Sequence, residues 1–182
     1  SASNLLKMQL DTNPISYKFT SNNDPHTIPI GVCTHALFSR ALQQTQEQIS
    51  TLVATILSPY GNRYLSLRPL LIEQLALFRS SCLYQVMMSA DLLHPEYGFA
   101  YRLHNRIVTG RIDALYYHAK QWYIVDYKTS QVSLESIDKK ALQYRPQMSL
   151  YADALRSQFN LSGPINTTIY FTRSGQSHSM LV

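Results

Sequence analysis

The stretch "WYIVDYKTS", Trp122 to Ser130, places an acid and a base at the end of a segment that is otherwise apolar and aromatic. This composition predicts a buried β-strand. Successive side chains of a strand point to opposite faces, so Asp126 and Lys128 share one face while Tyr127 points to the other. An aspartate and a lysine directed to the same face at the end of a buried strand require a specific reason.

Two more strand-like runs precede this one, "YGFAYRLH" at 97–104 and "RIVTGRIDALYYH" at 106–118. The connections around Asn105 and around Ala119 to Lys120 are short. Short connections of this kind join neighbouring antiparallel strands. The three runs therefore predict an antiparallel meander.

Asp113 lies inside the second run, between residues whose side chains suggest burial. A buried carboxylate costs several kcal/mol unless it is paired or binds a cation. One interpretation is an ion pair with Arg111 or Arg106, or the polar face of an edge strand. If the second and third runs form a hairpin, however, Asp113 and Asp126 lie toward the same end of the sheet and can share one ion. Oxygen ligands with open coordination positions favour Mg²⁺ or Mn²⁺.

The rest of the chain supplies helices and a second hairpin. Helical spacing and proline positions predict a helix over about 34–57 with Thr34 at its start, a helix from Pro69 to about Leu93 with Pro95 beyond its end, and a helix beginning near Pro146. "INTTIYFTR" and "QSHSMLV" form a terminal hairpin with a turn at Ser174–Gly175. The order of elements predicts an α/β domain with a mixed central β-sheet flanked by helices. Residues 1–30 are expected to form an irregular segment, because prolines and turn residues punctuate them.

Composition narrows the functional classes. The 182 residues, 45% of them hydrophobic, suit one folded domain, and the formal charge of +5 suits a polyanionic partner. Cys33 and Cys82 are too few to hold a four-cysteine iron–sulfur cluster. No apolar run is long enough to span a membrane, and the N-terminus lacks signal-peptide order, so a cytoplasmic protein is expected. The sequence begins without methionine and stops on a strand, which suggests a segment of a longer polypeptide.

Four short motifs occur in a set order: "GVCTH" (Gly31 to His35), "GRIDAL" (Gly110 to Leu115), "DYKT" (Asp126 to Thr129) and "QMSLY" (Gln147 to Tyr151). Together they resemble the PD-(D/E)XK nuclease superfamily, and most closely the RecB-like and AddA-like nuclease domains at the C-terminal end of bacterial recombination helicases. The resemblance covers roughly residues 31–172. It implies a restriction-endonuclease-like core, a nuclease domain over 31–182, and a helicase motor in the same polypeptide.

The resemblance also implies roles for individual residues. Asp113, Asp126, His35 and the main-chain carbonyl of Tyr127 are expected to bind Mg²⁺ or Mn²⁺, and Lys128 is expected to hold the attacking water. Without the resemblance, the position of His35 near the start of a helix favours a capping or core role over metal binding. Gln147 and Tyr151 lie four apart on one helix face, which suits either core packing by Tyr151 or an element beside the metal site that orients the helix or contacts DNA.

The residues just before that helix suit DNA binding. Lys139, Lys140, Tyr144 and Arg145 combine cations with an aromatic ring, a mixture that fits the phosphates and bases of a strand. One departure from the family pattern is that "FAYRLH" carries no glutamate before the first aspartate, which puts a second metal ligand in doubt.

These features predict a divalent-metal-dependent DNA exonuclease that acts on single-stranded ends in double-strand-break repair, together with a helicase and a possible partner subunit. The alternative is an inactive nuclease-like module that binds DNA or a partner. A small-molecule phosphohydrolase is disfavoured, because the chain has no glycine loop that would cradle phosphate.

Overall fold

The computed structural model describes residues 15–16, 30–103 and 106–182 of the chain. Most of the expected irregular segment at 1–30 therefore lies outside the described residues. The helices are α1 (Ile30–Gln43), α2 (Ile49–Leu57), η1 (Ser58–Leu67), α3 (Arg68–Ser80), α4 (Cys82–Met88), η2 (Leu134–Ser136), α5 (Ile137–Leu142) and α6 (Arg145–Phe159). The strands are β1 (Ile15–Ser16), β2 (Leu92–Leu103), β3 (Arg106–His118), β4 (Gln121–Lys128), β5 (Asn166–Phe171) and β6 (Gln176–Leu181).

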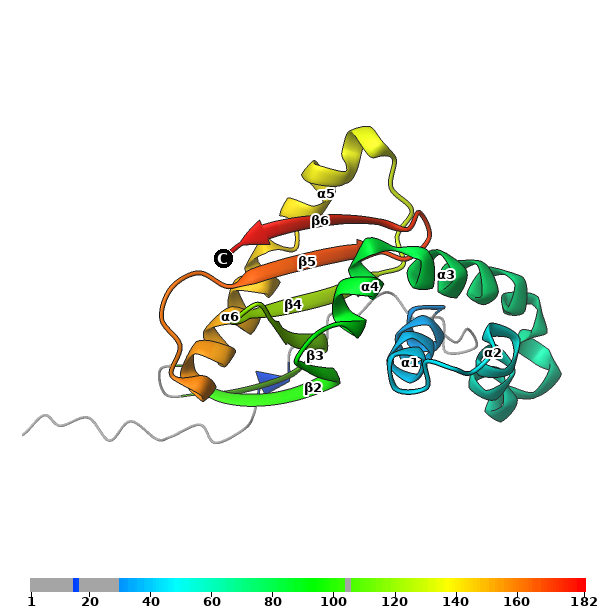
Figure 1. The fold of residues 1–182 in the computed structure, drawn as a ribbon, viewed down its shortest axis with the longest axis horizontal. Coiled ribbons are helices and arrows are strands. Elements are labelled where there is room, and N and C mark those ends of the chain that lie inside the picture. The colour runs from blue at the N-terminus through cyan, green and yellow to red at the C-terminus, as the bar shows by residue number, and fades with distance from the viewer. Residues whose placement is uncertain (1–14, 17–29, 104–105) are drawn as a thin grey trace, which may run out of the picture.

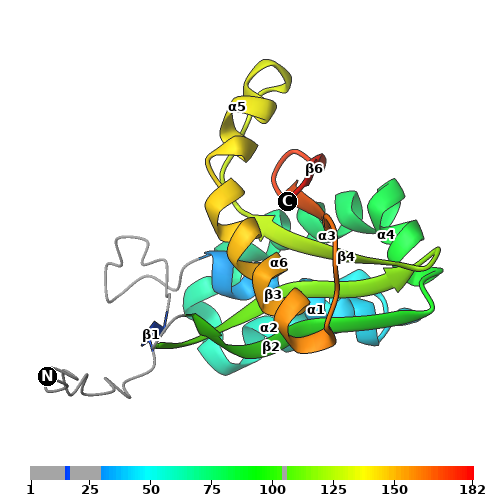
Figure 2. The same cartoon turned by 90° about the vertical axis from the view of Figure 1, so that its left-hand side faces the viewer.

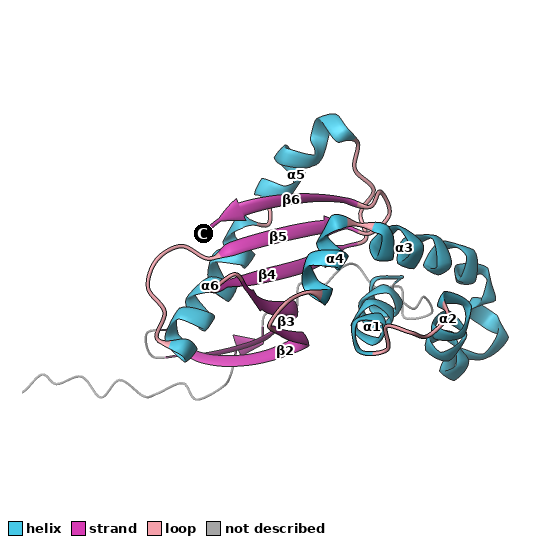
Figure 3. Ribbon diagram, viewed as in Figure 1, coloured by secondary structure: helices cyan, strands magenta, loops and turns pink. Residues whose placement is uncertain are grey.

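The strands form one mixed sheet (Figure 3). β2, β3 and β4 make the expected antiparallel meander, and β5 and β6 make the expected terminal hairpin. β4 and β5 run parallel, so the chain between them must cross over, and α6 provides this crossover. The short strand β1 pairs with β3 in parallel. The α/β fold with a mixed, helix-flanked sheet is confirmed.

Helices cover both faces of the sheet (Figures 1 and 2). Helices α1 to α4 pack on one face, where buried residues such as Phe38, Phe78 and Tyr127 form one core cluster. Helix α6 packs on the other face, where Ile124 and Leu155 belong to a second cluster. The alternation along β4 explains this division, because successive side chains enter opposite cores.

Two helices that the sequence predicted as continuous are each divided in the structure. The predicted helix over 34–57 is α1 followed by α2, and α1 begins four residues earlier than expected. Thr34 therefore lies inside α1, where its hydroxyl donates to the carbonyl of Ile30 at 2.9 Å, and it does not cap the helix start. Such a bond within a helix is a common alternative to capping for threonine.

The second predicted helix, from Pro69 to Leu93, is also divided, and its last residues belong to strand β2. The predicted helix from Pro69 to Leu93 ends at Ser80, and extended Ser81 then caps α4 by accepting a hydrogen bond from the Tyr84 amide. Strand β2 already begins at Leu92, so Pro95 lies within a strand rather than beyond a helix. Proline is tolerated there because β2, among the strands that the structure describes, pairs only with β3 and therefore leaves one side open for a residue without an N–H. Within the described residues, no helix is both long and apolar enough to cross a membrane.

Candidate metal centre and catalytic site

The site begins where β3 and β4 separate. Their antiparallel pairing runs from His118 opposite Gln121 to Ala114 opposite Val125. The same register would next place Asp113 opposite Asp126, but ladder pairing stops there. Instead, Asp113 Oδ2 accepts a hydrogen bond from the main-chain N–H of Tyr127 at 2.6 Å. The carboxylate thus satisfies a buried donor that the ladder leaves unpaired.

Glu96 lies on the other side of Asp113. In the β2–β3 register Pro95 pairs with Ala114 and Tyr97 pairs with Ile112, so Glu96 falls opposite Asp113. Its φ of 55° is in the left-handed region, which non-glycine residues rarely adopt and which often marks functional sites. The strand is therefore interrupted locally at the residue that faces the aspartate.

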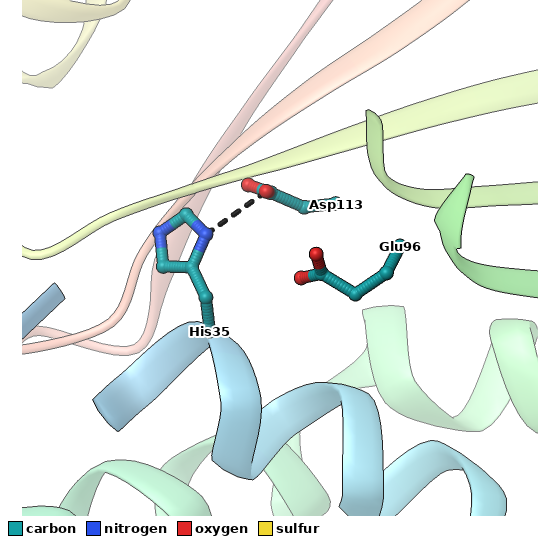
Figure 4. A group of neighbouring side chains, drawn as sticks. All are labelled: His35, Glu96 and Asp113. Carbon is teal, nitrogen blue, oxygen red and sulfur yellow. Dashed lines mark hydrogen bonds and ion pairs between the residues drawn. The ribbon is translucent and has the colours of Figure 1, made fainter. Parts of the chain in front are cut away.

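His35, Glu96 and Asp113 form a group that can hold a metal ion (Figure 4). Each offers one ligand atom, and these atoms lie within 4.8 Å of one another. Asp113 Oδ1 is 2.9 Å from His35 Nδ1. Two carboxylates and one imidazole supply hard oxygen ligands and a borderline nitrogen, a set that fits Mg²⁺ or Mn²⁺.

Glu96 was missed by sequence reasoning, and the expectation that the strand before Asp113 carries no glutamate is wrong. That expectation assumed a strand starting at Tyr97, because Pro95 suggested the end of a helix. The sequence did contain a signal for the longer strand. Proline is tolerated in edge strands, so "LLHPEYGF" can form one extended segment that includes Glu96. Glu96 is therefore a candidate for the further acidic ligand that "FAYRLH" does not supply.

His35 projects from α1 toward Asp113 and is partly buried. Burial lowers its pKa, but the hydrogen bond to Asp113 and the charges of Asp113, Asp126 and Glu96 outweigh that effect, so the pKa is raised. A metal ion bound here would have to displace this proton, which makes metal affinity dependent on pH.

Asp126 and Lys128 lie on the same face of β4, as the strand period predicts. Lys128 Nζ is 2.6 Å from Asp126 Oδ2. Asp126 is not a member of the three-residue group. Burial, followed by the charge of Asp113, raises the pKa of Asp126 to about 6, although Lys128 and His35 act in the opposite direction.

Helix α6 is joined to Lys128 through the two residues of the "QMSLY" motif. Lys128 Nζ donates to Gln147 Oε1 at 3.0 Å, and Gln147 Nε2 donates to the Tyr151 hydroxyl at 2.8 Å. Tyr151 is also buried against Phe99 of β2. Tyr151 therefore packs in the core, and Gln147 contacts Lys128.

The residues expected to bind DNA lie on or beside α5, which projects from the body of the domain (Figure 2). Lys139 and Lys140 are in the last turn of α5. The Tyr144 ring lies 4.6 Å from Lys128 Nζ and 6.0 Å from Lys140 Nζ, measured to the ring centroid. Arg145 donates to the carbonyl of Leu181 at 3.3 Å, so its guanidinium is tied to β6.

Comparison with known proteins agrees with this geometry. The family model described as "PD-(D/E)XK nuclease superfamily" matches residues 18–179, a range that contains all four motifs. No curated protein matches. Two solved structures share a weak likeness, one titled "Crystal structure of SSO0001" and the other "Crystal structure of protein VC1899 from Vibrio cholerae".

The first of these is 11% identical, with a TM-score of 0.35 and coverage of 82% of this chain and 65% of that chain. The second is 13% identical, with a TM-score of 0.28 and coverage of 60% and 36% respectively. The chain thus spans less than two thirds of either protein. The family model covers most of the chain and includes His35, Glu96, Asp113, Asp126 and Lys128. The chain belongs to the PD-(D/E)XK nuclease superfamily.

Proposed function

We propose that this domain is a Mg²⁺- or Mn²⁺-dependent DNA nuclease that hydrolyses phosphodiester bonds. The observation that carries the proposal is the position of Asp113. One oxygen contacts His35 in the candidate metal group, and the other accepts the amide of Tyr127, the residue between Asp126 and Lys128. A metal-binding group and a lysine that can act on phosphate are therefore adjacent within a nuclease fold.

His35, Glu96 and Asp113 would hold the cation, and Asp126 and the main-chain carbonyl of Tyr127 are further candidates. The N–H and C=O of one strand residue point to the same side of the strand, so the Tyr127 carbonyl is directed toward the Asp113 side. When bound, the cation would polarise the phosphate and lower the pKa of a coordinated water.

Lys128 is the residue best placed to act on the water and the phosphate. Asp126 and Gln147 both contact its ammonium, and the ring of Tyr144, the N-cap residue of α6, lies 4.6 Å from it. An ammonium fixed in this way offsets negative charge as it develops on the phosphate, without needing to reorganise. In the hydrolysis, the water gives up one proton as its oxygen forms a bond to phosphorus, the ester P–O bond breaks, and the leaving oxygen takes up one proton.

Gln147 and Tyr151 are proposed to position Lys128 rather than to react. Gln147 accepts from the ammonium and donates to the Tyr151 hydroxyl, so the chain of hydrogen bonds ends in the core. Tyr151 is 8% exposed, which leaves it little freedom to move. This arrangement keeps the ammonium beside Asp126 and Gln147.

A finer assignment follows from the motif resemblance. We propose an exonuclease domain of a RecB-like or AddA-like helicase–nuclease, acting on single-stranded DNA ends during double-strand-break repair, with a helicase motor in the same polypeptide. The order and spacing of the four motifs support this assignment. Lys139, Lys140, Tyr144 and Arg145 are proposed to contact the DNA.

Cleavage of end-labelled DNA tests the proposal. The domain is incubated with single-stranded or double-stranded DNA in Mg²⁺, Mn²⁺ or EDTA, and products are resolved by length. We expect metal-dependent cleavage that is lost in Asp113→Asn and in Lys128→Ala, which also controls for a contaminating nuclease. Binding without cleavage in any metal would instead favour an inactive nuclease-like module. Mononucleotide release would favour an exonuclease over an endonuclease.

A further inference from the structure

A groove of about 650 Å³ opens directly beside the candidate metal group. His35 and Glu96 line it, and so does Arg111, which lies two residues before Asp113 on β3. The opposite wall is helix α1, from which His35 projects toward Asp113 (Figure 4). A molecule bound in the groove would therefore contact residues that hold the metal.

The α1 wall follows from helix periodicity. Val32, Ala36 and Arg40 lie at intervals of four residues, so they share one face of the helix and follow each other along the groove. Val32 is 53% exposed, so its side chain is accessible to a ligand in the groove. The helix thus offers an apolar strip at its start and a guanidinium two turns later.

Charge in the groove favours an anion. Arg40 and Arg111 contribute two permanent positive charges against the single carboxylate of Glu96. Arg40 Nε donates to Gln44 Oε1 at 2.8 Å, which holds the guanidinium along the helix. Arg111 pairs with Glu96 Oε2 at 3.2 Å, but its side chain is 67% exposed and remains accessible to a ligand. An arginine fork suits phosphate oxygens.

From these features we propose that the groove binds a short single-stranded stretch of DNA on one side of the phosphate to be cleaved. Arg40 contacts a backbone phosphate, and Val32 and Ala36 contact a sugar or base. Positive charge along the backbone combined with apolar surface under the bases is the general pattern of single-strand binding. The groove volume falls within the range of about 300–1,000 Å³ typical of ligand pockets, which suits a few groups of one strand rather than a duplex. The inference rests on the proposed function and extends it.

The first test measures binding without cleavage. Fluorescence anisotropy of a short labelled single-stranded DNA is followed in EDTA over a series of salt concentrations. Arg40→Gln is expected to weaken binding several-fold and to reduce the slope of log K against log salt by about 0.7, the value for one phosphate contact on a single strand. Lys120→Gln, which removes a charge at the opposite end of β4, is the matched control and is expected to keep the slope.

The second test locates the DNA. Cys82 is exposed and Cys33 is buried, so a Cys82→Ser background leaves no exposed cysteine among the described residues. In that background Val32→Cys is expected to react with a maleimide, and single-stranded DNA should slow the reaction several-fold. Leu92→Cys, at a position that is 49% exposed at the start of β2 and pairs with Tyr117, should react at the same rate with and without DNA.

The outcomes separate this inference from the proposed function. An unchanged salt slope in Arg40→Gln, no protection of Val32→Cys, or tighter binding of duplex than of single strand would overturn the groove assignment while leaving metal-dependent cleavage intact. If no metal supports cleavage but both groove effects appear, the groove assignment stands and the nuclease activity does not.

Discussion

Asp113 Oδ2 accepts the main-chain N–H of Tyr127 at 2.6 Å, while Asp113 Oδ1 lies 2.9 Å from His35 Nδ1. One carboxylate therefore connects β3, β4 and α1. Because it replaces a missing ladder hydrogen bond, its position is fixed by the backbone of the neighbouring strand. The candidate metal group consequently has a rigid member before any ion binds.

Removing individual ligands is expected to reveal the metal site. Glu96→Gln should lower Mn²⁺ affinity, since the amide is a poorer ligand for a hard cation than the carboxylate. Asp113→Asn combined with Asp126→Asn should abolish binding, and isothermal titration calorimetry measures both. Asparagine at 113 keeps an oxygen for the Tyr127 amide, so loss of binding is not explained by an unpaired buried donor. Unchanged Mn²⁺ affinity in Glu96→Gln would exclude it as a ligand.

Lys128→Ala is expected to separate turnover from metal binding. Loss of the ammonium should reduce kcat by about 10²–10³, the usual effect of removing one preorganised group that stabilises transition-state charge. Mn²⁺ affinity should be retained or increase, because Lys128 Nζ no longer competes for Asp126. Single-turnover cleavage measures the rate of the chemical step, and calorimetry on the same preparation measures the Mn²⁺ affinity. Cleavage at the wild-type rate would place the catalytic group elsewhere.

In the metal-free protein, the contribution of Asp126 to stability should fall as pH rises. The pKa of Asp126 is raised from 3.8 to about 6, so the folded state binds this proton more tightly than the unfolded chain. This contribution to the free energy of unfolding is complete below about pH 4 and is lost as pH passes through 6, with a slope of at most about 1.4 kcal/mol per pH unit. The raised pKa of His35 acts in the same direction at higher pH.

Urea unfolding in EDTA at several pH values measures this effect. Other carboxylates also change protonation state between about pH 4 and pH 6. The quantity to compare is therefore the difference in free energy of unfolding between the wild type and Asp126→Asn. That difference should favour the wild type increasingly as pH is lowered from about 6 to 4. A difference independent of pH would mean that Asp126 titrates alike in the folded and unfolded states.

Gly110 should resist substitution, although it lies within a strand. A Cβ at this position would meet Phe99 Cζ at 2.5 Å, and Phe99 is buried against Tyr151. Gly110→Ala is therefore expected to reduce the free energy of unfolding by about 1–3 kcal/mol, the usual cost of overpacking. Gly98→Ala is a matched control on the partner strand, because nothing lies within 4 Å of its added Cβ. Equal stability of the two variants in urea would contradict this packing argument.

The lysines of α5 provide a test of a second DNA contact. Lys139 and Lys140 both lie in the last turn of α5, outside the candidate metal group. Changing both to alanine should weaken single-stranded DNA binding equally for all sequences and reduce the salt slope by about 0.7–1.4. Anisotropy in EDTA measures this change. An unchanged slope would restrict the DNA path to the groove beside α1 or to the arginines of β2 and β3.

The sequence by itself determined the features that depend on position within one element. The strand period placed Asp126 and Lys128 on one face of β4, and the structure has them in contact. The helical period placed Gln147 and Tyr151 on one face of α6, and their side chains form a hydrogen bond. The short connections between runs were enough for the β2–β3–β4 meander. These results follow because side-chain direction is fixed by local backbone geometry.

Only the tertiary structure decided where β2 begins and which residues from segments distant in the chain meet at the site. Glu96 became part of the metal group because Pro95 lies in an edge strand, and a proline reads equally well as a helix end when its neighbours in space are unknown. The break at Ser81 and the groove beside α1 likewise arise from packing between segments distant in the chain. Periodicity predicts only which side chains share a face of one helix or strand. A site is formed by contacts between several elements, and the energies of those contacts depend on the whole fold.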